Sequence, residues 1–221
     1  MQARTLALLL KLGRDRKRQP LKLIAQLDLI NRHDPLINLK NAGLDDADLH
    51  EVTLVNVSLQ EADLRLTDLR GANLRQSDLA WADLRGADLR RAVLTDSCLA
   101  NANLLPYDSQ NPAQLNVLHL HNGSDPTRVD KERKLLIPAG YTDRHLTLTK
   151  LGGANLQRAD LSGSFLYRTI LRGADLAKAN LRGADLRGAE LAEADLRGAR
   201  YDAETLWPRG FDPDSSEAVA D

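Results

Sequence analysis

The chain has 221 residues, 43% of them hydrophobic but only 4% aromatic, so leucine and alanine must fill the core of its one or two domains. With 30 basic and 31 acidic residues the net charge is −1, which excludes a strongly charged chain built to bind nucleic acid or a membrane surface. Cys98 is the only cysteine, which excludes an intramolecular disulfide and favours a reducing cytoplasm.

Residues 1–37 precede the repetitive part of the chain and are expected to form an N-terminal helical cap. Their apolar residues show helical spacing: Leu21, Ile24 and Leu27. A solenoid needs such a cover, because an open first coil exposes leucines and unpaired backbone. A helix that binds a partner or a membrane surface is the alternative, since residues 14–18 are basic. We expect no membrane span and no secretory signal in the apolar start.

A leucine recurs every fifth residue in two long runs. The first run continues without a miss from Leu39 to Leu104, and the second from Leu151 to Leu196. The residue two places before each leucine is small or β-branched, usually alanine, and the residue between them is often Asp or Asn. The repeating unit is therefore Ala-(Asp/Asn)-Leu-x-x.

A period of five fits neither of the common secondary structures. On an α-helix five residues precess by about 140°, so the leucines would spread around the rod. On a flat strand successive leucines would point to opposite faces. All of them can face one axis if the chain bends by about 90° once per unit and closes after four units. Leu44, Leu64 and Leu84 should then form one buried column, with Asp63 and Asp83 exposed.

The turns between units are expected to be of two kinds. Many units have glycine before the alanine, as at Gly71 and Gly86, and glycine suits a turn that needs a positive φ. Units with another residue there, such as Glu61, Gln76 or Lys178, are expected to use a different turn.

The repeated Ala-(Asp/Asn)-Leu-x-x units resemble those of the pentapeptide-repeat family. The resemblance implies an all-β solenoid, a right-handed quadrilateral β-helix, and its handedness comes from the resemblance because the period does not set it. Four units per coil predict about six coils, with a first part at 38–104 and a second part at 151–201. Some members of the family resemble duplex DNA, bind DNA gyrase and protect it from quinolones.

Residues 105–150 interrupt the repeat and are predicted to be an insertion, because Leu151 follows Leu104 by 47 positions, which is not a multiple of five. The simpler interpretation is a neutral bulge, since surface loops cost little entropy. The alternative hypothesis is that specific binding is carried here, because only the insertion has singular residues. These residues are Tyr107, His119, His121, Tyr141 and the basic cluster at 128–134.

Residues 202–221 are predicted to form a C-terminal cap and a disordered tail. Trp207 and Phe211 appear where the leucine ladder stops, and we expect one of them to fold over the last coil. The composition of 214–221 favours disorder. Dimerisation through this end of the rod is the competing interpretation.

The residues of the chain predict no enzyme: no catalytic, cofactor-binding or metal-binding residue is expected. His119 and His121 would share one face of a strand, with His145 nearby, but no cysteine accompanies them as a metal ligand. No phosphate-binding loop or nucleophile elbow occurs. Asp and Arg alternate along the repeats, as at Asp83 and Arg85, and are expected to form a solvated surface in which each pair contributes little.

The function predicted from these features is a non-enzymatic protein-interaction or scaffold module with an unknown protein partner, no cofactor, and no direct contact with nucleic acid or membrane. The alternative is a DNA mimic that binds and protects DNA gyrase. Residues 38–104 carry 11 acidic and 7 basic residues, whereas residues 151–201 carry 6 and 8. A DNA mimic should present a sustained negative surface, and only the first part leans that way.

Overall fold

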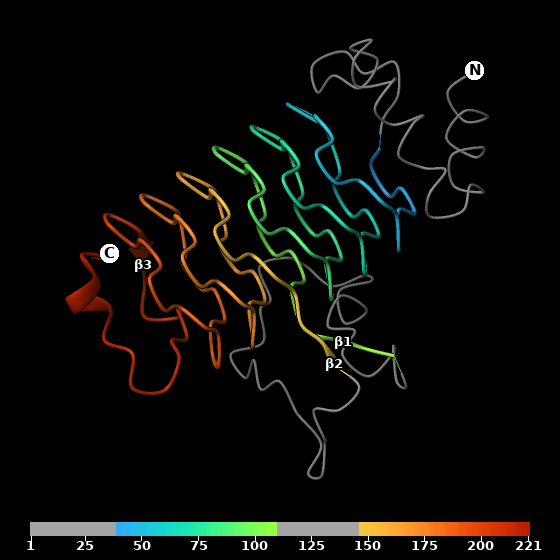
Figure 1. The fold of residues 1–221 in the computed structure, drawn as a ribbon. Helices are drawn as coiled ribbons and strands as arrows, with labels where there is room; N and C mark the ends of the chain where they lie inside the picture. Colours follow the sequence, from blue (N-terminus) through green and yellow to red (C-terminus); the bar gives the residue numbers. More distant parts are fainter. Residues whose placement is uncertain (1–38, 110–145) are drawn as a thin grey trace, which may run out of the picture.

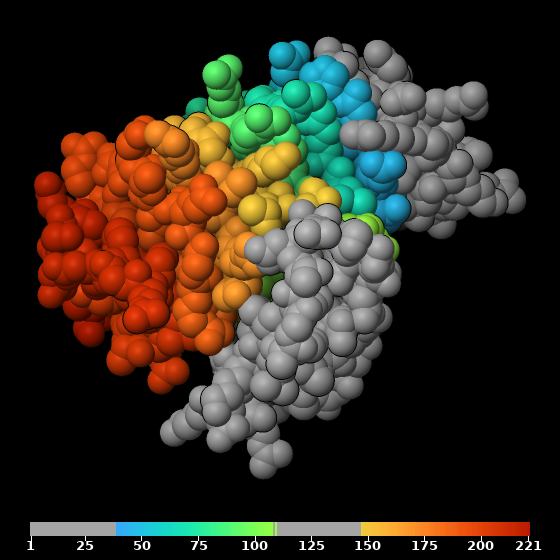
Figure 2. Space-filling view, turned by 60° about the horizontal axis from the view of Figure 1, so that its bottom comes forward, coloured from blue at the N-terminus to red at the C-terminus, as the bar shows by residue number. Residues whose placement is uncertain are grey.

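The computed structural model describes residues 39–109 and 146–221, which wind into coils stacked along one axis (Figure 1). Parallel β-bridges join each unit to the unit one coil later, as in Gly43↔Asp63 and Asp63↔Asp83. One coil therefore holds 20 residues, or four units. The space-filling view shows the described coils following one another along the rod in sequence order (Figure 2).

The leucine columns form the core of the rod. Leu44, Leu64 and Leu84 are buried, as predicted, and the small residues two places before each leucine are buried beside them. The expectation that Asp63 and Asp83 are exposed is wrong, because their side chains are only 33% and 14% exposed. Arginine side chains of their own units lie along these carboxylates and shield them from water.

The turns between units are all of one kind, so the prediction of a second kind is wrong. Glu61, Gln76 and Lys178 have φ values of 57°, 58° and 60°, close to the 64° of Gly71. The reason is the hydrogen bond between coils. The N–H of Glu61 donates to the carbonyl of Ala80 at 3.0 Å, just as the N–H of Gly71 donates to the carbonyl of Arg90 in the next coil. Each residue other than glycine pays about 1–2 kcal/mol for this left-handed backbone, and the ladder of bonds holds it there.

The Asp or Asn of each unit has a structural role. Its side-chain oxygen accepts the backbone N–H two residues later, at 3.2 Å from Arg70 to Asp68 and at 3.1 Å from Gln157 to Asn155. Asx side chains stabilise turns in this way, which explains why these two residue types recur at the position.

The second leucine run continues the columns of the first. Bridges join Asp88 to Lys150 and Asn103 to Phe165, so the coils stack without a break across the insertion. The chain leaves the rod through β1 (Tyr107–Asp108) and returns through β2 (Leu146–Thr147), which pair in antiparallel register.

Several predictions concern residues outside the described ranges. They are the helical cap at 1–37, the histidines His119, His121 and His145, Tyr141, and the basic cluster at 128–134. Across 39–109 and 146–221, no helix is long and apolar enough to cross a membrane.

The C-terminal residues cover the end of the coil stack. Trp207 and Phe211 pack against the core, as predicted, and their rings stack with centroids 5.0 Å apart. The expected disordered tail is wrong. Residues Pro213–Ser216 form the 3-10 helix η3, which the side chain of Asp212 caps, and β4 (Val219–Ala220) pairs in parallel with β3 (Arg200–Tyr201).

Candidate binding groove

Two neighbouring corners of the rod differ although the same kind of unit builds both. We call the first the insertion corner, with turn residues 65–66, 85–86 and 105–106, because the chain leaves the rod there. The next corner along the chain, with turn residues 70–71, 90–91, 152–153 and 172–173, is the groove corner. Tripeptides of the form Asp-Leu-Arg precede the turns at both corners.

The groove corner contains an open hollow of about 710 Å³. Its lining residues are Glu51, Arg70, Gly71, Arg90, Arg91, Gly152, Gly153, Ile170 and Arg172. The hollow exists because glycines of successive coils lack side chains here. A Cβ at Gly71, Gly152 or Gly153 would meet nothing closer than 3.5 Å, and one at Gly173 nothing within 4 Å.

Arginine side chains dominate the polar lining of this groove. Arg70 donates from Nε and Nη2 to the two oxygens of Asp68 at 2.8 and 2.6 Å, and Arg90 binds Asp88 in the same way. These hydrogen bonds hold the pKa of Asp68 below its usual value and raise the pKa of Arg70. Arg91 makes no ion pair with any residue in the described part of the chain.

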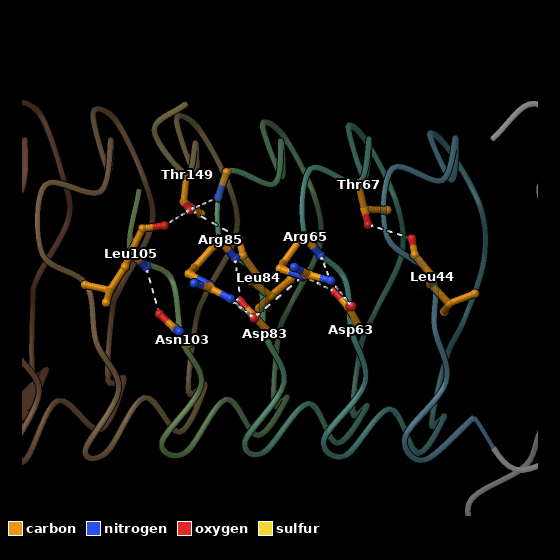
Figure 3. A network of polar contacts seen from close by, with 11 residues as sticks. Leu44, Asp63, Arg65, Thr67, Asp83, Leu84, Arg85, Asn103, Leu105 and Thr149 are labelled. Atoms are coloured by element: carbon orange, nitrogen blue, oxygen red, sulfur yellow. Dashed lines mark hydrogen bonds and ion pairs between the residues drawn. The ribbon is translucent and has the colours of Figure 1, made fainter. Parts of the chain in front are cut away.

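The insertion corner is closed rather than hollow. The side chain of Arg85 is only 2% exposed, and its guanidinium binds Asp83 at 2.9 and 2.7 Å. Nε of Arg65 lies 3.8 Å from the same carboxylate (Figure 3). A Cβ added at Gly86 would lie 2.8 Å from the Cβ of Tyr107, so β1 packs directly on this corner. The expectation of uniformly solvated Asp–Arg pairs is therefore wrong here.

Thr149 replaces a backbone bond where the chain re-enters the coil. Its hydroxyl accepts the N–H of Gly86 at 2.9 Å and lies 3.1 Å from the carbonyl oxygens of both Leu84 and Leu105 (Figure 3). The hydroxyls of Thr67, Ser77 and Thr169, at the same position of other units, also donate to a leucine carbonyl one coil earlier, as Thr67 does to Leu44 at 3.0 Å. Thr149 thus supplies an acceptor for the backbone N–H of Gly86 where the insertion interrupts the coil.

One cluster of the described residues has the composition of a metal site. Ligand atoms of Asp48, His50 and Asp68 lie within 4.8 Å of one another. Both oxygens of Asp68 accept hydrogen bonds from Arg70, whose positive charge would repel a cation. Nδ1 of His50 is hydrogen-bonded to the carboxylate of Asp48. The cluster is therefore better described as part of the ion-pair ladder than as a metal centre.

Sequence reasoning missed the groove. Of the singular residues in the insertion, only Tyr107 lies in the described ranges, and it packs over Gly86 at the closed corner. Arg91 and the glycines at 152–153 had no motif to single them out. They come together only when the coils stack. In the sequence, the pair of glycines directly after Leu151 was the one sign that side chains are absent there.

Comparison with known proteins identifies the repeat. A family model described as pentapeptide repeats matches in 8 copies, over residues 37–71, 72–104, 149–188 and 171–200. No curated protein sequence matches the chain.

Several solved structures resemble the chain. HetL from the cyanobacterium Nostoc sp. strain PCC 7120, a pentapeptide repeat protein involved in regulation of heterocyst differentiation, is 33% identical over 74% of this chain and 54% of its own, with a TM-score of 0.42. Thus the match spans little more than half of HetL. The Nostoc PCC 7120 protein alr5209 is 22% identical over 79% and 84% of the two chains, with a TM-score of 0.24. The plasmid-mediated fluoroquinolone resistance protein QnrB1 is 15% identical over 84% and 79%, with a TM-score of 0.35.

Proposed function

The chain belongs to the pentapeptide-repeat family and forms its right-handed quadrilateral β-helix, and we propose that it is a non-enzymatic scaffold that binds a protein partner. The observation that carries this proposal is the regular neutralisation of charge along the rod. Asp-Leu-Arg units hold their carboxylate and guanidinium against each other at several corners of the rod, as at residues 68–70, 88–90, 185–187 and 195–197.

The titration behaviour of these pairs supports a binding surface rather than a catalytic one. Hydrogen bonds from Arg70 and Arg197 hold the pKa values of Asp68 and Asp195 below their usual range. The pKa of Arg197 is raised in return. Acid–base catalysis needs groups whose pKa values move toward neutrality, whereas these move away from it. Such pairs stay charged and fixed, which suits a rigid docking surface.

The same pairing disfavours the alternative of a DNA mimic. A mimic needs columns of uncompensated carboxylates along one face. Here Asp68 and Asp88 stand one above the other, and each is bound by its own arginine. We expect the purified protein to give no protection of DNA gyrase from a quinolone at stoichiometric concentration in a supercoiling assay. Robust protection of gyrase would favour the DNA-mimic hypothesis over the scaffold hypothesis.

We also propose a rod of about six coils, a helical cap at 1–37 and a cytoplasmic location. Dimerisation through the C-terminal end remains the competing arrangement, and light scattering on the purified chain separates a monomer from a dimer.

Affinity capture from the native host tests the scaffold directly. We would compare the full chain with a variant in which residues 109–145 are replaced by a two-residue Asn-Gly turn. Asp108 and Leu146 are register partners in β1 and β2, so a short hairpin turn can join the two strands. Capture of one partner by both proteins assigns binding to the coils, and capture by the full chain alone assigns it to the insertion. A failure of both folded proteins to retain any partner contradicts the scaffold.

A further inference from the structure

We propose that the groove at the groove corner binds an extended acidic segment of a protein partner, an inference that rests on the scaffold function and names its contact surface. The groove is the open hollow of the described part that combines a glycine floor with several guanidinium groups. Its length, its unused hydrogen-bond donors and the charges at its two ends suit such a segment.

The length of the groove suits a short extended peptide. Its lining runs along one corner from Glu51 to Arg172, which lie four coil-to-coil steps apart. Four steps of about 4.8 Å give a groove about 19 Å long, and an extended chain rises about 3.4 Å per residue. About six residues therefore fit. Alternate side chains of such a segment point to one face, so three carboxylates could face the arginines while the residues between them face solvent or Ile170.

The arginines keep donors available for a second carboxylate. A guanidinium carries five N–H donors, and Arg70 and Arg90 each spend Nε and Nη2 on their own aspartate. The edge formed by Nη1 and Nη2 remains for a ligand, because the paired aspartate occupies only the other edge. The side chains of Arg70 and Arg90 are 51% and 50% exposed, so a peptide can reach them.

Arg91 supplies a positive charge that no aspartate of the described residues neutralises, unlike the charges of Arg70 and Arg90. It is exposed, lines the groove, and makes no ion pair with any residue of 39–109 or 146–221. Since the charges of Arg70 and Arg90 are balanced locally, Arg91 contributes most of the net attraction for an anion. Long-range attraction of this kind should weaken as salt is added.

The charges around the groove favour an acidic peptide over a nucleic acid. Glu51 lines one end, and at the other end Arg172 is bound to Glu193 at 2.9 Å. A continuous phosphate backbone would extend past the groove toward these carboxylates, whereas a six-residue segment can end before them.

A labelled peptide with the sequence Glu-Val-Glu-Val-Glu-Val, blocked at both ends, is the probe, and Gln-Val-Gln-Val-Gln-Val is its neutral control. Fluorescence anisotropy at low and physiological salt would measure its affinity for the full chain and three variants. Arg91→Glu reverses the uncompensated charge. Gly152→Glu fills the groove, and it should fold because a Cβ there lies 3.5 Å or more from its neighbours. Lys178→Glu is the matched control, since Lys178 occupies the same turn position as Arg91, with φ values of 60° and 59°, at a different corner.

We expect the acidic peptide to bind in a salt-dependent manner and the neutral peptide not to bind. Arg91→Glu and Gly152→Glu should each weaken binding at least about tenfold, and Lys178→Glu should change it by less than about twofold. Equal affinity for all three variants, or no binding to the native chain at low salt, would overturn the groove. A single-stranded oligonucleotide of six phosphates that binds the same variants in the same order and more tightly would overturn the choice of a peptide.

The two proposals can fail separately. A partner captured equally well by the native chain and by Arg91→Glu removes the groove and leaves the scaffold in place. Binding of the acidic peptide by a chain that captures no partner contradicts the scaffold while the chemistry of the groove stands.

Discussion

The insertion corner and the groove corner use the same tripeptide in two different surroundings. Asp83-Leu84-Arg85 and Asp88-Leu89-Arg90 follow each other in the chain, and both arginines bind their aspartate through Nε and Nη2 with nearly equal distances. The side chain of Arg85 is nevertheless 2% exposed, whereas that of Arg90 is 50% exposed. The sequence of the unit determines the local ion pair, whereas the packing over the corner determines how much that pair contributes to stability.

This difference assigns different tasks to the two corners. At the insertion corner β1 and β2 cover the turns, and Thr149 completes the hydrogen bonds that the interrupted coil would lose. At the groove corner the turns stay open, and glycine replaces the side chains that would fill the space. Stability should therefore be most sensitive to changes at the first corner, and binding to changes at the second.

The largest effect is expected from the core that both corners share. Leu84→Asp places a carboxylate without a partner among buried leucines and should abolish cooperative folding, a cost above about 4 kcal/mol. Val55→Asp is the matched control because Val55 is 39% exposed, and it should change stability by less than about 0.5 kcal/mol. Circular dichroism during thermal unfolding measures both. An unchanged melting temperature for Leu84→Asp would contradict the stacked-coil core.

The next largest effect is expected from Arg85 and Arg90, whose substitution by alanine should cost different amounts of stability. Arg85→Ala leaves the partly buried carboxylate of Asp83 without its closest cation and should cost about 3 kcal/mol. Arg90→Ala removes an exposed pair and should cost at most about 1 kcal/mol. Urea unfolding of both variants checks the difference. Equal losses would show that burial at the insertion corner does not strengthen the pair.

Glycines at the two corners give a smaller contrast. Gly86 and Gly173 have φ values of 69° and 65°, so alanine at either position carries about 1–2 kcal/mol of backbone strain. Only Gly86→Ala also meets Tyr107 and the side chain of Leu66, at 2.8 and 3.0 Å. We expect Gly86→Ala to be the more destabilising by at least about 1 kcal/mol, measured by urea unfolding. Equal destabilisation would mean that β1 does not pack on Gly86.

The smallest expected effect is the pH response of the exposed pairs. The pKa of Asp68 lies below its value in the unfolded chain because Arg70 donates to it. Such a group stabilises the fold fully above the unfolded pKa, near 3.9, and this contribution is lost as the pH falls through the folded value. The melting temperature should therefore hold between about pH 7 and 5 and fall below about pH 4. Asp68→Asn should reduce this fall slightly, and a decline that begins near pH 6 would contradict this assignment.

The sequence allowed the coil and its core to be predicted because a leucine every fifth residue fits neither a helix nor a flat strand, whereas a chain that bends once per unit can bury every leucine. It could not locate the groove. After an insertion that breaks the five-residue count, Leu151 could enter any of the four columns, so nothing in the sequence places Gly152 beside Arg90. The burial of Arg85 was missed for a related reason, since its Asp-Leu-Arg unit is the same as that of its neighbour Arg90 and nothing within the unit distinguishes the two arginines. The turns were mispredicted at Gln76 because local preference was given more weight than the bonds between coils.

The central claim is that the rod continues across the insertion in one register, since this register builds the groove. Cys98 provides the most direct test because it and Asp160 are bridge partners in adjacent coils on either side of the insertion. Bridge partners have the Cα separation that a disulfide needs, about 5 Å. Mild oxidation of Asp160→Cys should therefore yield an intramolecular disulfide, detected by peptide mapping, whereas Asn180→Cys, one coil further from Cys98, should remain reduced. Oxidation of Asn180→Cys with Asp160→Cys left reduced would contradict the register and, with it, the groove.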